Sequence, residues 1–234
     1  MGWRIAGVSR LPILILILGS WAVTPNAFAA GIPLPGEMGR GHVVGISLGF
    51  DPTFTAGVTY AYIFRMAERP VAAEVAFSAP LALIPHGDHG TIRGGVATFA
   101  APENSHWNGW IAAGLDLTAG RTAVSRERST GFYVAATPGY FSRRWYAGPT
   151  VRYRKTLVTH REHTSWYRRV YPGVTDGWYR NNTGFLVLGI AGGVSVGRNL
   201  ALSGLAGYKL SDDLRSYDPF VIPAAAELSM RYRF

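Results

Sequence analysis

Histidine, arginine and aromatic side chains are concentrated between residues 159 and 182, and several kinds of chemistry could use them. His160 and His163 precede Asp176, and an imidazole beside a carboxylate can act as the base of a hydrolase when a hydroxyl such as that of Ser165 joins it. No nucleophile motif of the G-x-S-x-G type accompanies them. A hydrolase of lipid or peptide, with His160, His163 and Asp176 as catalytic candidates, is therefore kept as the alternative function.

The same two histidines have the spacing H-x-x-H, which can present two imidazoles to a metal ion. Glu162 could add an oxygen, but a stable site needs three or four converging ligands. Spacing alone does not supply that convergence. We therefore expect no metal site and no cofactor.

Arginines interleaved with aromatic residues suit a third chemistry, the binding of phosphate or sugar. The candidates are Arg161, Trp166, Arg168, Arg169, Trp178 and Arg180. Residues 121–128 add three arginines against one glutamate. Nucleic acid would also suit such residues. The secretory signal peptide expected at the N-terminus excludes it, because an exported protein does not meet cytoplasmic nucleic acid.

Strands must position these side chains, because the chain after residue 40 alternates with a period of two. Val44, Ile46, Leu48 and Phe50 alternate with small or polar residues, and the pattern returns over 54–65 and 224–234. No run of eighteen apolar residues follows residue 30, which excludes membrane-spanning helices. The bulky face of each strand is apolar and the other is small or polar.

The first 29 residues have the order of a secretory signal peptide. Arg4 and Arg10 precede and flank an aliphatic run over 11–18, and Ala27-Phe28-Ala29 is an A-x-A cleavage site. An uncleaved anchor is the alternative. Cleavage would remove two arginines and lower the formal net charge from +9 to +7.

The final segment ends its apolar face on Tyr232 and Phe234. With the signal peptide and the alternation, it resembles the bacterial outer-membrane β-barrels, whose last strand carries a terminal aromatic that the assembly machinery reads. The resemblance implies a Gram-negative outer membrane, Tyr232 and Phe234 as the assembly signal, and outer-membrane lipid and lipopolysaccharide as surroundings. Physically, strands that cross lipid must close into a barrel, because lipid cannot hydrogen-bond an open edge.

The alternation predicts an all-β, antiparallel up-and-down barrel of about ten strands in one domain, residues 30–234, with eight or twelve as alternatives. The expected strands are 41–50, 54–66, 71–78, 91–101, 109–119, 132–141, 145–158, 183–194, 199–209 and 223–234. After a tight turn at 51–53, long loops at 79–90, 120–131, 159–182 and 210–222 should face outside, opposite short periplasmic turns. A soluble sandwich or lipocalin-like barrel would instead point its bulky face inward.

Alternation also places a set of charged residues in the lumen. This lumen cluster is Glu74, Asp116, Arg152, Arg154, Glu227 and Arg231. Arg152 could bridge Asp116 and Glu227 with its planar fork. The cluster is interpreted as a salt-bridged plug, with a narrow anion-leaning pore as the second interpretation. Aromatic residues near strand ends, including Trp107, Trp110, Phe141, Trp145 and Tyr146, are assigned to interfacial girdles.

Composition agrees with a barrel that works without an enzyme site. Hydrophobic residues make up 48% of the chain, charged residues 16%, and cysteine is absent, which removes disulfides and thiolate chemistry. We expect a monomeric structural or surface-binding protein whose basic loops contact lipopolysaccharide or an external ligand. A narrow pore is a further possibility.

Overall fold

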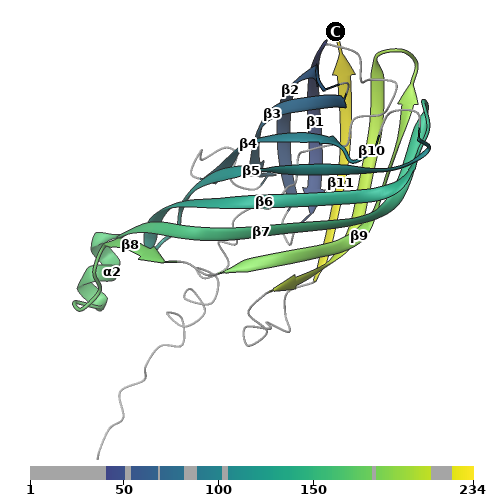
Figure 1. Cartoon of the computed structure of the whole chain (residues 1–234). Coiled ribbons are helices and arrows are strands. Elements are labelled where there is room, and N and C mark those ends of the chain that lie inside the picture. The colour runs from purple at the N-terminus through teal and green to yellow at the C-terminus, as the bar shows by residue number, and fades with distance from the viewer. Residues whose placement is uncertain are drawn as a thin grey trace, which may run out of the picture.

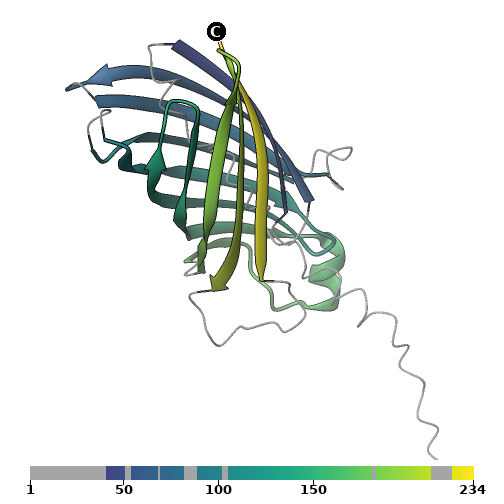
Figure 2. The ribbon, with the colours of Figure 1, turned by 90° about the vertical axis from the view of Figure 1, so that its right-hand side faces the viewer.

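A computed structural model describes residues 41–50, 54–67, 69–81, 89–101, 105–180, 183–211 and 223–234. Ten antiparallel strands close into a barrel (Figures 1 and 2), which confirms the predicted fold class. They are β1 (Gly41–Phe50), β2 (Phe54–Met66), β3 (Arg69–Pro80), β4 (His89–Phe99), β5 (Trp107–Arg121), β6 (Ser125–Phe141), β7 (Trp145–His163), β9 (Gly184–Val196), β10 (Leu200–Ser211) and β11 (Ala224–Arg233). Helix α2 (Ser165–Val170) and the short strand β8 (Gly177–Arg180) lie between β7 and β9. The predicted signal peptide lies outside the described residues.

Each strand of the barrel pairs with its neighbours along the chain, and β1 pairs with β11 to close it. At this seam the N–H of Phe234 donates to the carbonyl of His42 at 3.1 Å. The Phe234 ring stacks on the His42 ring with centroids 5.9 Å apart. Tyr232 and Phe234 both point outward and are exposed.

The period of two sorts the wall into an apolar outside and a polar inside. On β1, Ile46 and Leu48 are 51% and 59% exposed, while Ser47 between them is 5% exposed. A soluble barrel has the opposite arrangement, so this wall is that of a barrel that crosses a membrane with its strands. No helix among the described residues is long and apolar enough to cross a membrane.

Two of the predicted long loops contain strand residues. The expected loop at 120–131 is wrong, because β5 runs to Arg121 and β6 begins at Ser125. The turn between them is held by Thr122, whose hydroxyl accepts the N–H of Ser125 at 3.0 Å. The expected loop at 159–182 is shortened in the same way, since β7 runs to His163 and α2 and β8 follow. The polar side chains at 125–131 and 159–163 alternate between the two faces as in any strand. Their polarity on both faces is what indicated a loop.

The barrel has two unlike ends. The turn end carries the connections at 142–144 and 197–199 together with Phe234. The loop end carries the turn at 122–124, α2 and β8. Strands β6 and β7 run past their neighbours at the loop end and carry α2 and β8 with them (Figure 1).

Candidate functional sites in the lumen and on the wall

Arginines of β7 form ion pairs with acids on two other strands across the lumen. Arg154 donates from Nε to Oδ2 of Asp116 on β5 at 3.0 Å, and its Nη2 contacts the same oxygen and the Thr118 hydroxyl. Arg152 donates from Nη1 to Oε2 of Glu227 on β11 at 3.2 Å. The sequence-based hypothesis gave both acids to Arg152. The structure instead pairs Asp116 with Arg154, because the two inward arginines each meet a different strand.

Glu74 on β3 belongs to a second polar group in the lumen. Tyr133 donates from its hydroxyl to Oε1 of Glu74 at 3.0 Å. The Arg93 guanidinium lies 4.9 Å from the centroid of the Tyr133 ring and is 2% exposed. Arg231 is also buried and lines a small cavity with Glu74. Sequence reasoning missed Arg93 and Tyr133, although alternation from Thr91 would have placed Arg93 inward.

The turn end of the lumen is filled by aromatic rings. Phe99 contacts Trp110 and Phe141 with centroids 5.2 and 5.1 Å apart, and Phe141 stacks on Tyr146 at 5.4 Å. The girdle assignment of Trp110, Phe141 and Tyr146 is therefore wrong, because their strand positions have inward parity. Trp107, by contrast, points outward and is 74% exposed.

The described side chains pack across the lumen, which predicts that the protein does not conduct ions. Two cavities between its side chains, one beside Arg152 and one beside Glu74, measure about 10 Å³ each, roughly the room for one water molecule. We expect the wild-type protein in planar bilayers to give no single-channel current. Stable current steps would contradict a filled lumen.

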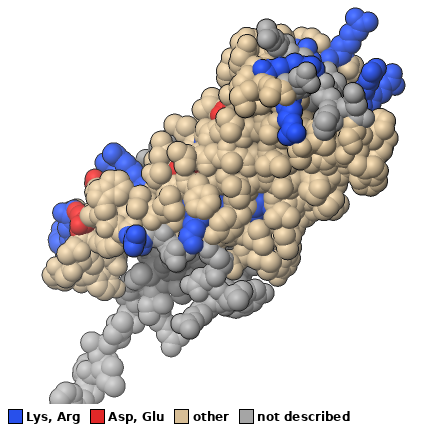
Figure 3. Space-filling view, viewed as in Figure 1, with Lys and Arg blue, Asp and Glu red and all other residues tan. Residues whose placement is uncertain are grey.

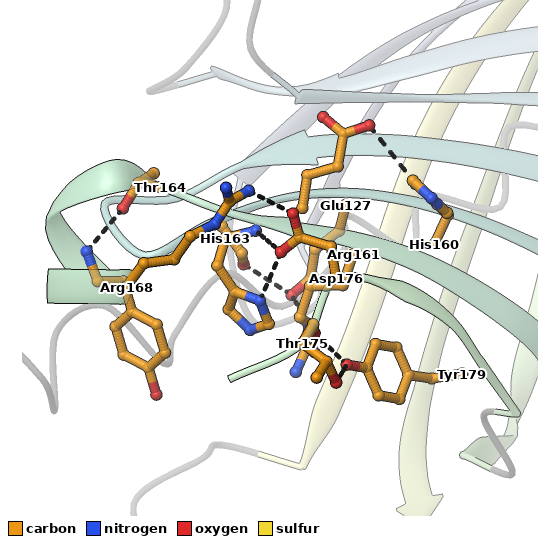
Figure 4. Close-up of polar contacts among 12 residues, drawn as sticks. Glu127, His160, Arg161, His163, Thr164, Arg168, Thr175, Asp176 and Tyr179 are labelled. Atoms are coloured by element: carbon orange, nitrogen blue, oxygen red, sulfur yellow. Dashed lines mark hydrogen bonds and ion pairs between the residues drawn. The ribbon is translucent and has the colours of Figure 1, made fainter. Parts of the chain in front are cut away.

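Beyond the barrel, β6, β7 and β8 form a small sheet, and one of its faces continues the lumen. On this inner face Arg161 pairs with Glu127, with Nε 2.8 Å from Oε1. Asp176 accepts the backbone N–H of His163 at 2.9 Å, lies 3.0 Å from its Nδ1, and also contacts Arg168 (Figure 4). These contacts, the backbone N–H first, hold the pKa of Asp176 below its ordinary value.

The His163–Asp176 pair has the geometry of an oriented base, but no nucleophile from the described part of the chain joins it. Thr164 is the N-cap of α2: its hydroxyl accepts the N–H of Tyr167 and donates to the carbonyl of Ala123 at 3.1 Å. Among the described residues, no hydroxyl hydrogen-bonds His163. His160 lies on the opposite face of the sheet, against Trp178 at 4.9 Å. Nor do three metal-ligating side chains converge in the part of the chain that the structure describes.

The other face of this sheet continues the lipid-facing wall and carries an arginine strip, defined as Arg121, Arg126, Arg128 and Arg180. Arg121 follows the outward Leu117 and Ala119 on β5 and stands directly opposite Arg126 on β6. All four arginines are exposed, and no ion pair to them is found within the described residues. The one acid on this face, Glu162, stands opposite Arg126 and lies 3.7 Å from Nδ1 of His160, so four arginines face one acid. Like charges placed directly opposite are destabilising without a counter-charge. The strip is therefore a candidate anion site.

The strip could not be assembled from sequence alone, because its members come from three strands. Register places Arg128 beside His160, and His160 beside Trp178. Of the six predicted binding residues, Trp178 and Arg180 lie on this outer face. Arg161 and Arg168 are paired with acids on the inner face, and Trp166 and Arg169 lie exposed on α2.

A groove on the lipid-facing wall adjoins the strip. This loop-end groove has a volume of about 450 Å³. Small residues run across four strands at one level: Ala56, Ala79, Gly90 and Ala119. Bulky residues line the next level toward the middle of the wall: Val58, Phe77, Ile92 and Leu117. Because Ala119 pairs with Arg128, the apolar groove opens directly beside the arginines.

Comparisons with known proteins identify no family. No protein-family model matches the chain, and no curated protein matches its sequence. Among solved structures, 23 chains match. One is described as "TodX monoaromatic hydrocarbon channel deltaS2 mutant", at 7% identity and a TM-score of 0.33, over 90% of this chain and 92% of that chain. This similarity is too distant to transfer a ligand.

Proposed function

We propose that the protein is an outer-membrane barrel that does not conduct and that binds lipopolysaccharide on its outer wall. The observation that carries the proposal is the arginine strip beside the loop-end groove. A single amphiphile with phosphates and acyl chains satisfies both, since phosphate suits arginine and acyl chains suit an apolar groove.

The unlike ends of the barrel support an orientation in which the strip faces the outer leaflet. Barrels of bacterial outer membranes keep short turns in the periplasm and larger structures outside. The turn end would then be periplasmic, and the loop end, with the strip, would lie at the outer leaflet. Lysines and arginines gather toward both ends of the face in Figure 3, and the wall between them is mostly of other residues. The predicted signal peptide agrees with export.

The spacing along β5 supports a phosphorylated headgroup at the level of the strip. On β5 the exposed apolar face runs through Ile111, Leu115 and Leu117, and Arg121 follows four residues after Leu117. Four residues of strand span about 13 Å. Phosphates at the level of the arginines would thus place acyl chains against the groove and the wall below it.

The proposal predicts that removing three charges of the strip abolishes most lipopolysaccharide binding. Each arginine near an anionic lipid surface contributes about 1 kcal/mol, so Arg121→Gln/Arg126→Gln/Arg128→Gln should weaken binding by about 100-fold. The measurement is binding of purified lipid A, with and without its phosphates, to full-length protein in nanodiscs.

The matched control is Arg143→Gln/Arg144→Gln/Arg198→Gln, which removes the same charge at the turn end. It should bind lipid A as the wild type does, and the strip variant should bind the dephosphorylated lipid as weakly as the wild type does. Equal losses in the two triple variants would contradict a site at the strip, as would wild-type affinity in the strip variant.

Within the same proposal, Tyr232 and Phe234 are the signal that barrel assembly machinery reads, and the barrel works as a monomer. The outward, exposed placement of both rings at the β1–β11 seam supports the first part. The second rests on the absence of any need for a partner to close the sheet.

A further inference from the structure

A second groove lies on the outer wall at the turn end, away from the strip. This turn-end groove has a volume of about 780 Å³. Ala147, Gly192 and Gly204 form its floor as neighbours across β7, β9 and β10. Ile190 and Leu228 stand beside the floor and are 70% and 71% exposed. The depression therefore exists because the floor positions carry a methyl group or no side chain, where the surrounding positions carry large ones.

Aromatic rings mark the membrane boundary just above this groove. Tyr140 stacks on Trp145 with centroids 5.0 Å apart, and Trp107 meets Tyr140 edge-on at 6.0 Å. Such rings sit at the level of lipid headgroups. The groove below them thus lies at the depth of acyl chains in the leaflet at the turn end.

Arginines occupy the turns above the same rings. Arg143 and Arg144 lie in the turn between β6 and β7, and Arg198 lies in the turn between β9 and β10; all three are exposed. The N–H of Ser195 donates to the carbonyl of Arg144 at 2.7 Å, which holds the two turns together. Ala147 follows Arg144 by three positions, about 10 Å of strand.

No acidic residue balances these arginines along their own strands. The sequence has no Asp or Glu between Glu127 and Glu162, nor between Asp176 and Asp212. The turn end therefore combines positive charge at headgroup level with an apolar groove at acyl level. The complementary molecule has one anionic headgroup and acyl chains.

We infer that the turn-end groove binds an anionic glycerophospholipid of the inner leaflet, with its phosphate on Arg144 and Arg198. A second copy of the chain fits less well. A two-fold contact inside a membrane keeps both copies at the same depth, so it would bring the arginines of the two copies together. A zwitterionic lipid would leave the positive charge without a partner.

The test compares phosphatidylglycerol with phosphatidylethanolamine of the same acyl chains, added to delipidated full-length protein and read by native mass spectrometry. Wild-type protein should retain phosphatidylglycerol in preference. Arg144→Gln/Arg198→Gln should weaken that binding by about tenfold or more. The control Arg168→Gln/Arg169→Gln, which removes the same charge from α2 at the other end of the barrel, should leave it unchanged.

A second variant tests the groove itself. Ala206 lines the groove and points outward, so Ala206→Trp fills it without touching the lumen. We expect loss of retained phosphatidylglycerol with unchanged heat-modifiable mobility. Equal retention of the two lipids by the wild type would overturn the inference, as would a dimer that Ala206→Trp dissolves. Lipid A binding is measured in the same variants. Unchanged lipid A binding beside lost phosphatidylglycerol binding shows that the two lipids use different sites, so each proposal can fail without the other.

Discussion

Replacing Arg154 by methionine should lower the free energy of unfolding by about 3–5 kcal/mol, because it leaves the Asp116 carboxylate buried without its partner. Arg154 and Asp116 are each 1% exposed. Water cannot solvate the remaining charge in a filled lumen. The loss in the free energy of unfolding therefore includes the penalty of an uncompensated buried charge as well as the loss of one contact.

Urea unfolding in lipid vesicles, followed by tryptophan fluorescence, measures this change. Asp116→Leu/Arg154→Met removes both charges and should recover most of the loss, since an apolar pair can replace a buried ion pair at little cost. Arg128→Met, an exposed position, is the surface control. An Arg154→Met protein within about 1 kcal/mol of wild type would contradict the buried pair.

Replacing Gly95 by valine should cost about 2–5 kcal/mol, combining overpacking with the loss of a buried hydrogen bond. A Cβ at position 95 would collide with the Tyr133 hydroxyl and lie 2.6 Å from the carbonyl oxygen of Ala113. The Tyr133 ring would have to move, and its hydrogen bond to Glu74 would break.

The neighbouring Gly94 supplies a matched control. A Cβ there would meet nothing within 4 Å, so Gly94→Val adds the same side chain to the lipid-facing side of the same strand. Heat-modifiable mobility and urea unfolding should show a normal barrel for Gly94→Val and a destabilised one for Gly95→Val. Equal destabilisation in the two variants would contradict the prediction that close packing of Gly95 against Tyr133 is required for stability.

Alternation made most of the wall predictable. The bounds of β1 and β2 match the expected ranges, and ten strands follow from runs of bulky residues at every second position. The loop-end residues of β5 (120–121), β6 (125–131) and β7 (159–163) were not predictable in this way. There Arg126, Arg128 and their neighbours alternate polar with polar, so the pattern that marks a lipid-facing strand disappears where the wall leaves the membrane.

The candidate sites also differ in how far alternation along a strand predicts them. Inward parity places Asp116, Arg152 and Arg154 in the lumen from sequence, but which arginine meets which acid depends on the stagger between strands. The grooves are harder to predict from sequence, because each is made by small residues on four or more strands. Arg121 and Arg180 are 59 positions apart in the sequence, and only the pairing of β5 through β8 puts them on one face.

Photo-crosslinking in living cells tests the outer-wall account most directly. A photoreactive amino acid at Ala119, which lines the loop-end groove beside Arg128, should form an adduct that reacts with antibodies to lipopolysaccharide. The same amino acid at Leu202, which points outward near the turn end, should form none. An adduct at both positions, or at neither, would contradict a lipopolysaccharide site at the loop end of the wall.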